Sequence, residues 1–127
     1  MKKAAAMIGL ALVAMVPGVA CAEPDNVVVI GVPDGGLAAK ALLAGDFSKA
    51  VRKLQPMRVD GANDPARLIN LGNAYAGVGR MADAREAYRS ARFAPDTMLV
   101  LANGTEESSR DVAVRALGRL NPHYAMR

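Results

Sequence analysis

Residues 65–95 read PARLINLGNAYAGVGRMADAREAYRSARFAP, and their pattern predicts the helical architecture. It carries two sets of small or apolar residues spaced i, i+3, i+4 and i+7, which are Leu68, Leu71, Gly72 and Tyr75, then Ala84, Ala87, Tyr88 and Ala91. That spacing places each set on one face of an α-helix. Gly79 lies between the sets and predicts a turn. We therefore expect two helices folded back on each other, with Gly72 and Ala84 small enough to let their backbones cross closely.

Two motifs in this stretch resemble those of the tetratricopeptide repeat family. The family's L-G-x-x-Y stands here at residues 71–75, and its A-x-x-x-[FY]-x-x-A stands at residues 84–91. Pro95 closes the unit one residue earlier than is usual in the family. The resemblance covers one repeat well, and it implies a helix-turn-helix scaffold that acts as a binding module for other proteins.

Residues 34–56 repeat the pattern of the central stretch in a shorter form. Pairs of similar residues lie 34 positions apart, among them Leu37 and Leu71, Gly45 and Gly79, Ala50 and Ala84, and Leu54 and Tyr88. This is the tetratricopeptide period, so residues 34–56 resemble a degenerate first repeat. A helix capped by Asp34 is expected at residues 37–44, and a second at residues 47–55, where Pro56 ends it. Chance recurrence of small residues in an alanine-rich chain is the alternative.

Shorter elements flank the repeats. Asp64 is placed to cap the first central helix, and Pro65 to take its first position, where the missing N–H costs nothing. Residues 27–30 and 98–101 are β-branched or apolar and predict two short strands. Because an isolated strand leaves its backbone groups unpaired, the two strands are candidates to pair with each other.

A last helix is expected at residues 109–120, after a turn at residues 103–104. One of the serines at residues 108–109 is its expected cap, and the acidic pair at residues 106–107 suits a helix start. The apolar stripe of this helix consists of Ala113, Ala116, Leu117 and Leu120. The Asn-Pro pair at residues 121–122 stops it. Such a helix can cover the open end of the repeats, as terminal capping elements do.

The N-terminus has the three parts of a secretory signal peptide. Two lysines form a basic start, residues 4–16 are apolar apart from one glycine, and residues 20–22 offer an A-x-A-like site. We therefore expect export with cleavage after Ala22, and an uncleaved N-terminal anchor is the alternative. A further alternative is a bacterial lipoprotein with Cys21 as its lipidated first residue, although Gly18 stands where that route favours a large apolar residue.

Composition limits the classes of partner. The chain has 127 residues, one cysteine and a formal net charge of +4. Removal of residues 1–22 would take away both N-terminal lysines and the cysteine, so the exported chain would carry a charge of +2 and no disulfide. A charge this small gives no support for binding to nucleic acid or to an anionic membrane surface. The remaining length suits one small domain with a single core.

Patterns for catalysis or metal binding are not found in the sequence. His123 is the only histidine and follows Pro122 in the tail, whereas a zinc site needs several such ligands. Gly31 and Gly36 have the spacing of a phosphate loop, but leucine and alanine follow where that loop needs lysine and then serine or threonine. We therefore predict no cofactor, no metal and no enzymatic activity.

The candidate binding face lies on the first central helix and consists of Ala66, Ile69, Asn70, Asn73 and Ala76. In the tetratricopeptide family this inner face commonly holds an extended peptide, and the two asparagine amides here are able to bond a peptide backbone. Because no third repeat follows, we expect an exposed apolar patch that mediates partner binding or weak self-association. Two alternatives stay open. The amides are plain surface groups, or an acidic partner docks on the next helix at Arg85, Arg89 and Arg92.

The sequence therefore predicts a mainly α fold of tetratricopeptide-like repeats with a C-terminal capping helix and two short flanking strands. Its parts are a signal peptide at 1–22, a segment with a short strand at 23–33, the repeats at 34–96, and a strand, turn, capping helix and tail at 97–127. The expected function is that of a non-enzymatic scaffold or adaptor, periplasmic or secreted in a bacterial cell envelope, with a protein or peptide partner. The alternatives are an enzyme accessory, or an outer-membrane lipoprotein subunit of an envelope assembly that contacts the membrane only through Cys21.

Overall fold

The computed structural model describes residues 27–30, 37–56 and 62–120, and this part of the chain is mainly helical, as predicted. Its helices are α1 (Ala39–Leu43), α2 (Phe47–Leu54), α3 (Pro65–Gly77), α4 (Met81–Phe93) and α5 (Ser109–Leu120). Strands β1 (Met98–Val100) and β2 (Glu106–Ser108) pair antiparallel. No helix in these ranges is long and apolar enough to cross a membrane. The predictions that lie outside the described residues are the signal peptide with Cys21, the Asp34 cap, the stop at residues 121–122 and the tail with His123.

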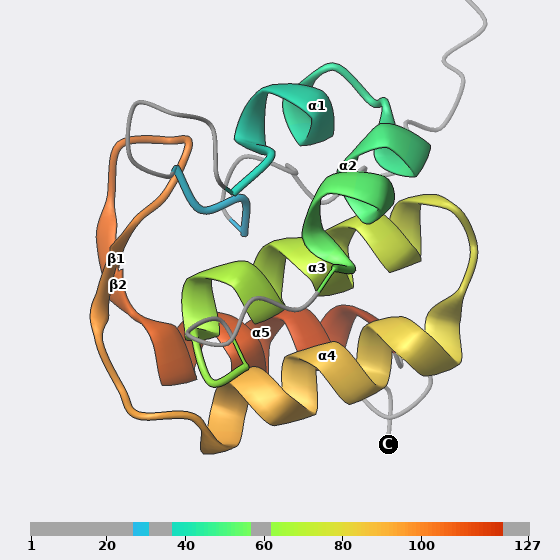
Figure 1. The fold of residues 1–127 in the computed structure, drawn as a ribbon. Coiled ribbons are helices and arrows are strands. Elements are labelled where there is room, and N and C mark those ends of the chain that lie inside the picture. Colours follow the sequence, from blue (N-terminus) through green and yellow to red (C-terminus); the bar gives the residue numbers. More distant parts are fainter. Residues whose placement is uncertain (1–26, 31–36, 57–61, 121–127) are drawn as a thin grey trace, which may run out of the picture.

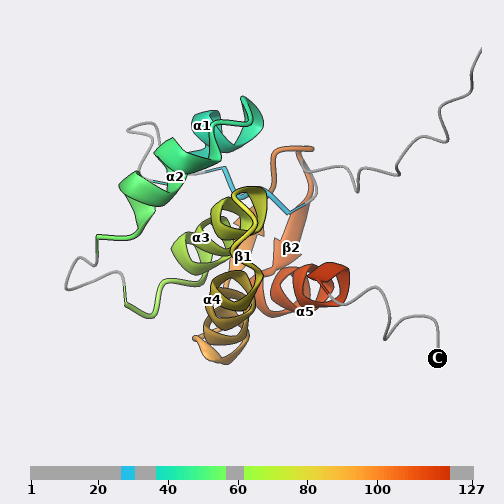
Figure 2. The ribbon, with the colours of Figure 1, turned by 90° about the vertical axis from the view of Figure 1, so that its right-hand side faces the viewer.

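The helices are arranged around α3 (Figures 1 and 2). α3 and α4 run antiparallel as a hairpin, and α1 and α2 lie on the opposite side of α3 from α4. Figure 2 looks nearly along α3, α4 and α5 and shows α5 beside this hairpin. The C-terminal helix thus covers the central pair, in the place expected of a capping helix.

One glycine lies in the turn between the two helices of each pair. Gly79 has φ +84° and Gly45 has φ +75°, a left-handed conformation that residues with a side chain rarely adopt. They lie 34 residues apart, so the structure repeats its turn at the period seen in the sequence. The predicted cap of α3 is also confirmed, because the Asp64 carboxylate accepts the N–H of Ala66 at 3.0 Å and Pro65 is the first helical residue.

The close crossing of α3 and α4 depends on Gly72. A Cβ atom at this position would collide with the ring of Tyr88 on α4. The tyrosine ring is buried and lies directly on the bare backbone of α3. The role expected of Gly72 is therefore confirmed.

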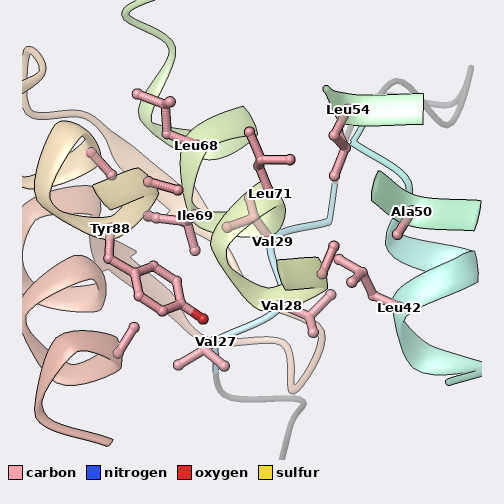
Figure 3. Packing of buried hydrophobic residues seen from close by; sticks show 14 of the residues in the cluster. Val27, Val28, Val29, Leu42, Ala50, Leu54, Leu68, Ile69, Leu71 and Tyr88 are labelled. Atoms are coloured by element: carbon pink, nitrogen blue, oxygen red, sulfur yellow. The ribbon is translucent and has the colours of Figure 1, made fainter. Parts of the chain in front are cut away.

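The apolar core is continuous from the segment at residues 27–29 to α5 (Figure 3). Residues 34 apart are buried in both helix pairs, since Ala50 and Leu54 of α2 occupy the core as Ala84 and Tyr88 of α4 do. Two alanines of the stripe predicted on α5 are buried, and its two leucines are half-buried. One core therefore holds all the helices together.

The two strand candidates pair with each other, as the sequence suggested. Val29 lies opposite Leu101 in an antiparallel bridge just beyond β1. The N–H of Ile30 bonds the C=O of Val100 at 2.9 Å, and the N–H of Ala102 bonds the C=O of Val28 at 2.8 Å. The extended segment at residues 27–30 therefore lies against one edge of β1, and β2 occupies the other edge.

Three local predictions were wrong. Residues 106–108 form β2 rather than the approach to a helix, because they pair with β1 across the turn at Gly104. The expected serine cap of α5 is replaced by Asp96, which lies just before β1. Its carboxylate accepts the N–H of Arg110 at 3.2 Å and the hydroxyls of Ser108 and Ser109. α1 begins only at Ala39, because Ala38 adopts a left-handed conformation with φ +52°.

Candidate functional site

The five residues of the candidate binding face lie on α3, but the face is not exposed as the sequence predicted. Ile69 and Asn70 are 0% exposed and Asn73 is 9% exposed, whereas Ala66 and Ala76 are half-buried. The two asparagines are covered by the chain's own extended segment, residues 27–30, to which both are bonded. The expectation of an exposed apolar patch was wrong because Asn70 and Asn73 bond the backbone groups of Val27 and Val29, which would otherwise lack partners.

Asn70 makes two hydrogen bonds to the segment. Its Oδ1 accepts the N–H of Val29 at 2.9 Å, and its Nδ2 donates to the C=O of the same residue at 2.8 Å. The second N–H of the amide donates to the C=O of Leu37 at 2.8 Å. A side-chain amide offers acceptor and donor side by side, so Asn70 bonds Val29 as a neighbouring strand would.

Asn73 adds a further bond and is itself oriented by Tyr88. Its Nδ2 donates to the C=O of Val27 at 2.9 Å, while its Oδ1 accepts the hydroxyl of Tyr88 at 2.6 Å. Burial raises the pKa of the Tyr88 phenol and outweighs the charge of Arg119, which lowers it, so the hydroxyl stays protonated and remains a donor. The amide of Asn73 is therefore fixed with its N–H side toward the segment.

The segment is thus held from two sides, by side-chain amides of α3 and by the backbone beside β1. Each of these bonds goes to a backbone N–H or C=O of the segment. Val27, Val28 and Val29 bury their side chains among the helices, as Figure 3 shows, whereas Ile30 is exposed. The site therefore holds residues 27–30 through their backbone groups and buries three valine side chains.

A cavity of about 200 Å³ borders the same network. Its lining is mostly apolar and comes from the start of the segment and from helices α1 to α5. Arg119 of α5 also lines it, and burial lowers the pKa of that guanidinium, with repulsion from Arg115 adding to the effect. Sequence reasoning missed Arg119, although its place beside Ala116 at the edge of the predicted stripe was a usable signal.

The second face proposed from sequence lies on the outer side of α4. Arg89 and Arg92 are exposed there, and Arg85 is half-buried. Phe93 is 75% exposed next to them, with the Arg92 guanidinium 5.6 Å from its ring centre. Docking of an acidic partner on this face stays a prediction.

Within residues 27–30, 37–56 and 62–120, no group of three or more His, Cys, Asp or Glu side chains is placed to hold a metal ion. The chemistry that the described site can perform is hydrogen bonding to an extended chain. Comparison of the chain with protein-family models, with curated proteins and with solved structures found no match.

Proposed function

We propose that the chain is an exported, non-enzymatic interaction module of a bacterial envelope, a helical scaffold that binds an extended segment of a partner protein. One observation carries this proposal. Asn70 bonds both the N–H and the C=O of Val29, which is how a protein recognises backbone shape rather than a particular side chain. The resemblance of residues 65–95 to a tetratricopeptide repeat supports it, because that family presents the same helix face to peptides.

The segment at residues 27–30 already occupies the face, so it limits how tightly a partner can bind there. A partner segment of similar shape competes with residues 27–30 for the amides of Asn70 and Asn73. A tethered segment acts at an effective concentration on the order of millimolar. A partner therefore needs further contacts, which the half-buried rim at Ala66 and Ala76 offers on the same helix.

Export rests on the N-terminal sequence. The basic start, the apolar run and the A-x-A-like site favour cleavage after Ala22 and a periplasmic or secreted protein. N-terminal sequencing of the exported chain tests this step. Glu23 as the first residue supports it, and a lipid-modified Cys21 would place the protein on a membrane instead.

Photo-crosslinking in the exporting cell tests where the partner binds. A crosslinking amino acid is placed in separate variants at Ala66 and Ala76 on the α3 rim, and at Arg92 on the outer side of α4 as the matched control. We expect a protein adduct from the α3 positions and none from Arg92. Adducts from Arg92 alone would move the binding face to α4. Turnover of a substrate by the purified chain would contradict the non-enzymatic assignment.

A further inference from the structure

A mostly apolar cavity lies beside the asparagine network. Its volume is about 200 Å³, and its apolar wall includes Val28, Leu42, Phe47, Ala76 and Ala116. An apolar cavity of about 150 Å³ is large enough to bind benzene. This cavity can therefore take a somewhat larger apolar group.

Arg119 gives the cavity a charge. It is the one charged residue among the described residues that line the cavity. Its guanidinium is partly withdrawn from water, and an opposite charge is attracted more strongly there than in bulk solvent. Arg119 lies in the last turn of α5, whose C-terminus carries about half a negative charge, and the full charge of the guanidinium outweighs it.

We propose that this cavity binds a small apolar carboxylate, with its tail against the apolar wall and its carboxylate on Arg119. A guanidinium carries five N–H donors, so it can bond a ligand oxygen in addition to its contacts within the chain. Tyr88 and Asn73 also line the cavity, but their hydroxyl and amide oxygen are bonded to each other at 2.6 Å. The anion is therefore recognised by Arg119.

The site is independent of the peptide face in its chemistry but contacts the same segment. Val27 and Val28 contribute to the lining, so a ligand in the cavity packs against the segment that α3 holds. Binding of the carboxylate should thus slow the exchange of the amide protons in residues 27–30. Failure of partner binding would leave this prediction untouched.

Titration of the purified chain with sodium octanoate, followed by nuclear magnetic resonance of the backbone amides, tests the proposal. 1-Octanol serves as the neutral probe with the same tail. We expect saturable shifts at Val28, Ala76 and Ala116, with octanoate bound more tightly than octanol. Arg119→Gln should weaken octanoate binding by about tenfold or more, as expected for loss of a charge-assisted hydrogen bond, and leave octanol binding unchanged. The exposed Arg110 of the same helix provides the control Arg110→Gln, which should change neither.

Ala76→Leu fills the cavity and should abolish the binding of both probes. The proposal is overturned if octanoate gives no saturable shifts, if its shifts lie away from the cavity, or if Arg119→Gln binds it as tightly as the wild type. The comparison of octanoate with octanol uses the wild-type chain. It therefore tests the proposal even if a variant fails to fold. Equal affinity for the two probes would show that Arg119 does not recognise an anion.

Discussion

Asn70 gives Val29 the hydrogen bonds that a second neighbouring strand would otherwise give. Val29 is buried, and a buried backbone N–H or C=O without a partner is costly. Asn70 satisfies both groups, and Asn73 satisfies the C=O of Val27 while Tyr88 takes its remaining oxygen. At this scale the three polar side chains act as part of the core.

Replacement of Asn70 by alanine should therefore be severe. The variant leaves the N–H and C=O of Val29 without their partner, and unsatisfied buried groups cost about 1–3 kcal/mol each, so we expect a loss of about 3 kcal/mol in the free energy of unfolding. The matched control Asn63→Ala removes an exposed amide and should change it by less than about 0.5 kcal/mol. Urea denaturation measures both, and equal stabilities for the two variants would contradict the role of Asn70.

The phenol of Tyr88 should make the fold sensitive to alkali. Burial raises its pKa in the folded state, whereas the unfolded chain has the ordinary value of about 10. The protonated Tyr88 phenol therefore contributes fully to the free energy of unfolding below about pH 10, and this contribution is lost as the pH rises above that value. Tyr88→Phe should cost about 1–2 kcal/mol at pH 7, because the Asn73 oxygen loses its donor. The variant should then lose less stability than the wild type between pH 9 and pH 11 in denaturation measured at each pH, and parallel curves would contradict this account.

The central hairpin depends on the close approach of α3 and α4. Gly72 gives up a side chain so that the ring of Tyr88 can lie on the helix backbone. Glycine in a helix interior costs about 0.5–1 kcal/mol relative to alanine, so its presence is explained by the packing that it permits. Position 118 of α5 provides the contrast, since a Cβ atom there meets nothing within 4 Å.

These two glycines make a matched pair of variants. Gly72→Ala should lower the free energy of unfolding by about 1–2 kcal/mol, because overpacking outweighs the gain in helix propensity. Gly118→Ala should raise it by about 0.5–1 kcal/mol, because only the propensity changes. Thermal unfolding of both measures the difference, and a stabilising Gly72→Ala would remove the argument for close crossing.

The start of α5 should be sensitive to acid. The hydroxyl of Ser108 and then the N–H of Arg110 lower the pKa of Asp96 in the folded chain. The unfolded value is about 3.9, so the contribution of Asp96 is present above that pH and is lost as the pH falls through the folded value. We expect Asp96→Asn to be less stable than the wild type at neutral pH. It should also lose less stability than the wild type on acidification. Circular dichroism between pH 6 and pH 2 measures it, and the same acid response in both proteins would contradict this role.

For the whole molecule, the sequence predicted the helices and the turns within each pair better than it predicted what covers the face of α3. The spacing of residues 68–75 and 84–91 predicted the central hairpin, and Gly45 and Gly79 marked both turns, because these signals are local. The contact of Asn70 with Val29 spans 41 residues, and an asparagine on a helix face looks the same in sequence whether water or a strand covers it. The sequence could thus single out this face of α3, but not the segment that covers it.

Hydrogen exchange at residues 27–30 tests whether the chain's own segment fills the asparagine-lined face of α3. Buried, bonded amides exchange only when the structure opens. We predict that the amide protons of Val29 and Ile30 exchange as slowly as those of α3, and that Asn70→Ala accelerates them more than it accelerates the amides of α4. Exchange of Val29 and Ile30 at the rate of an unstructured chain, while α3 stays protected, would contradict the account.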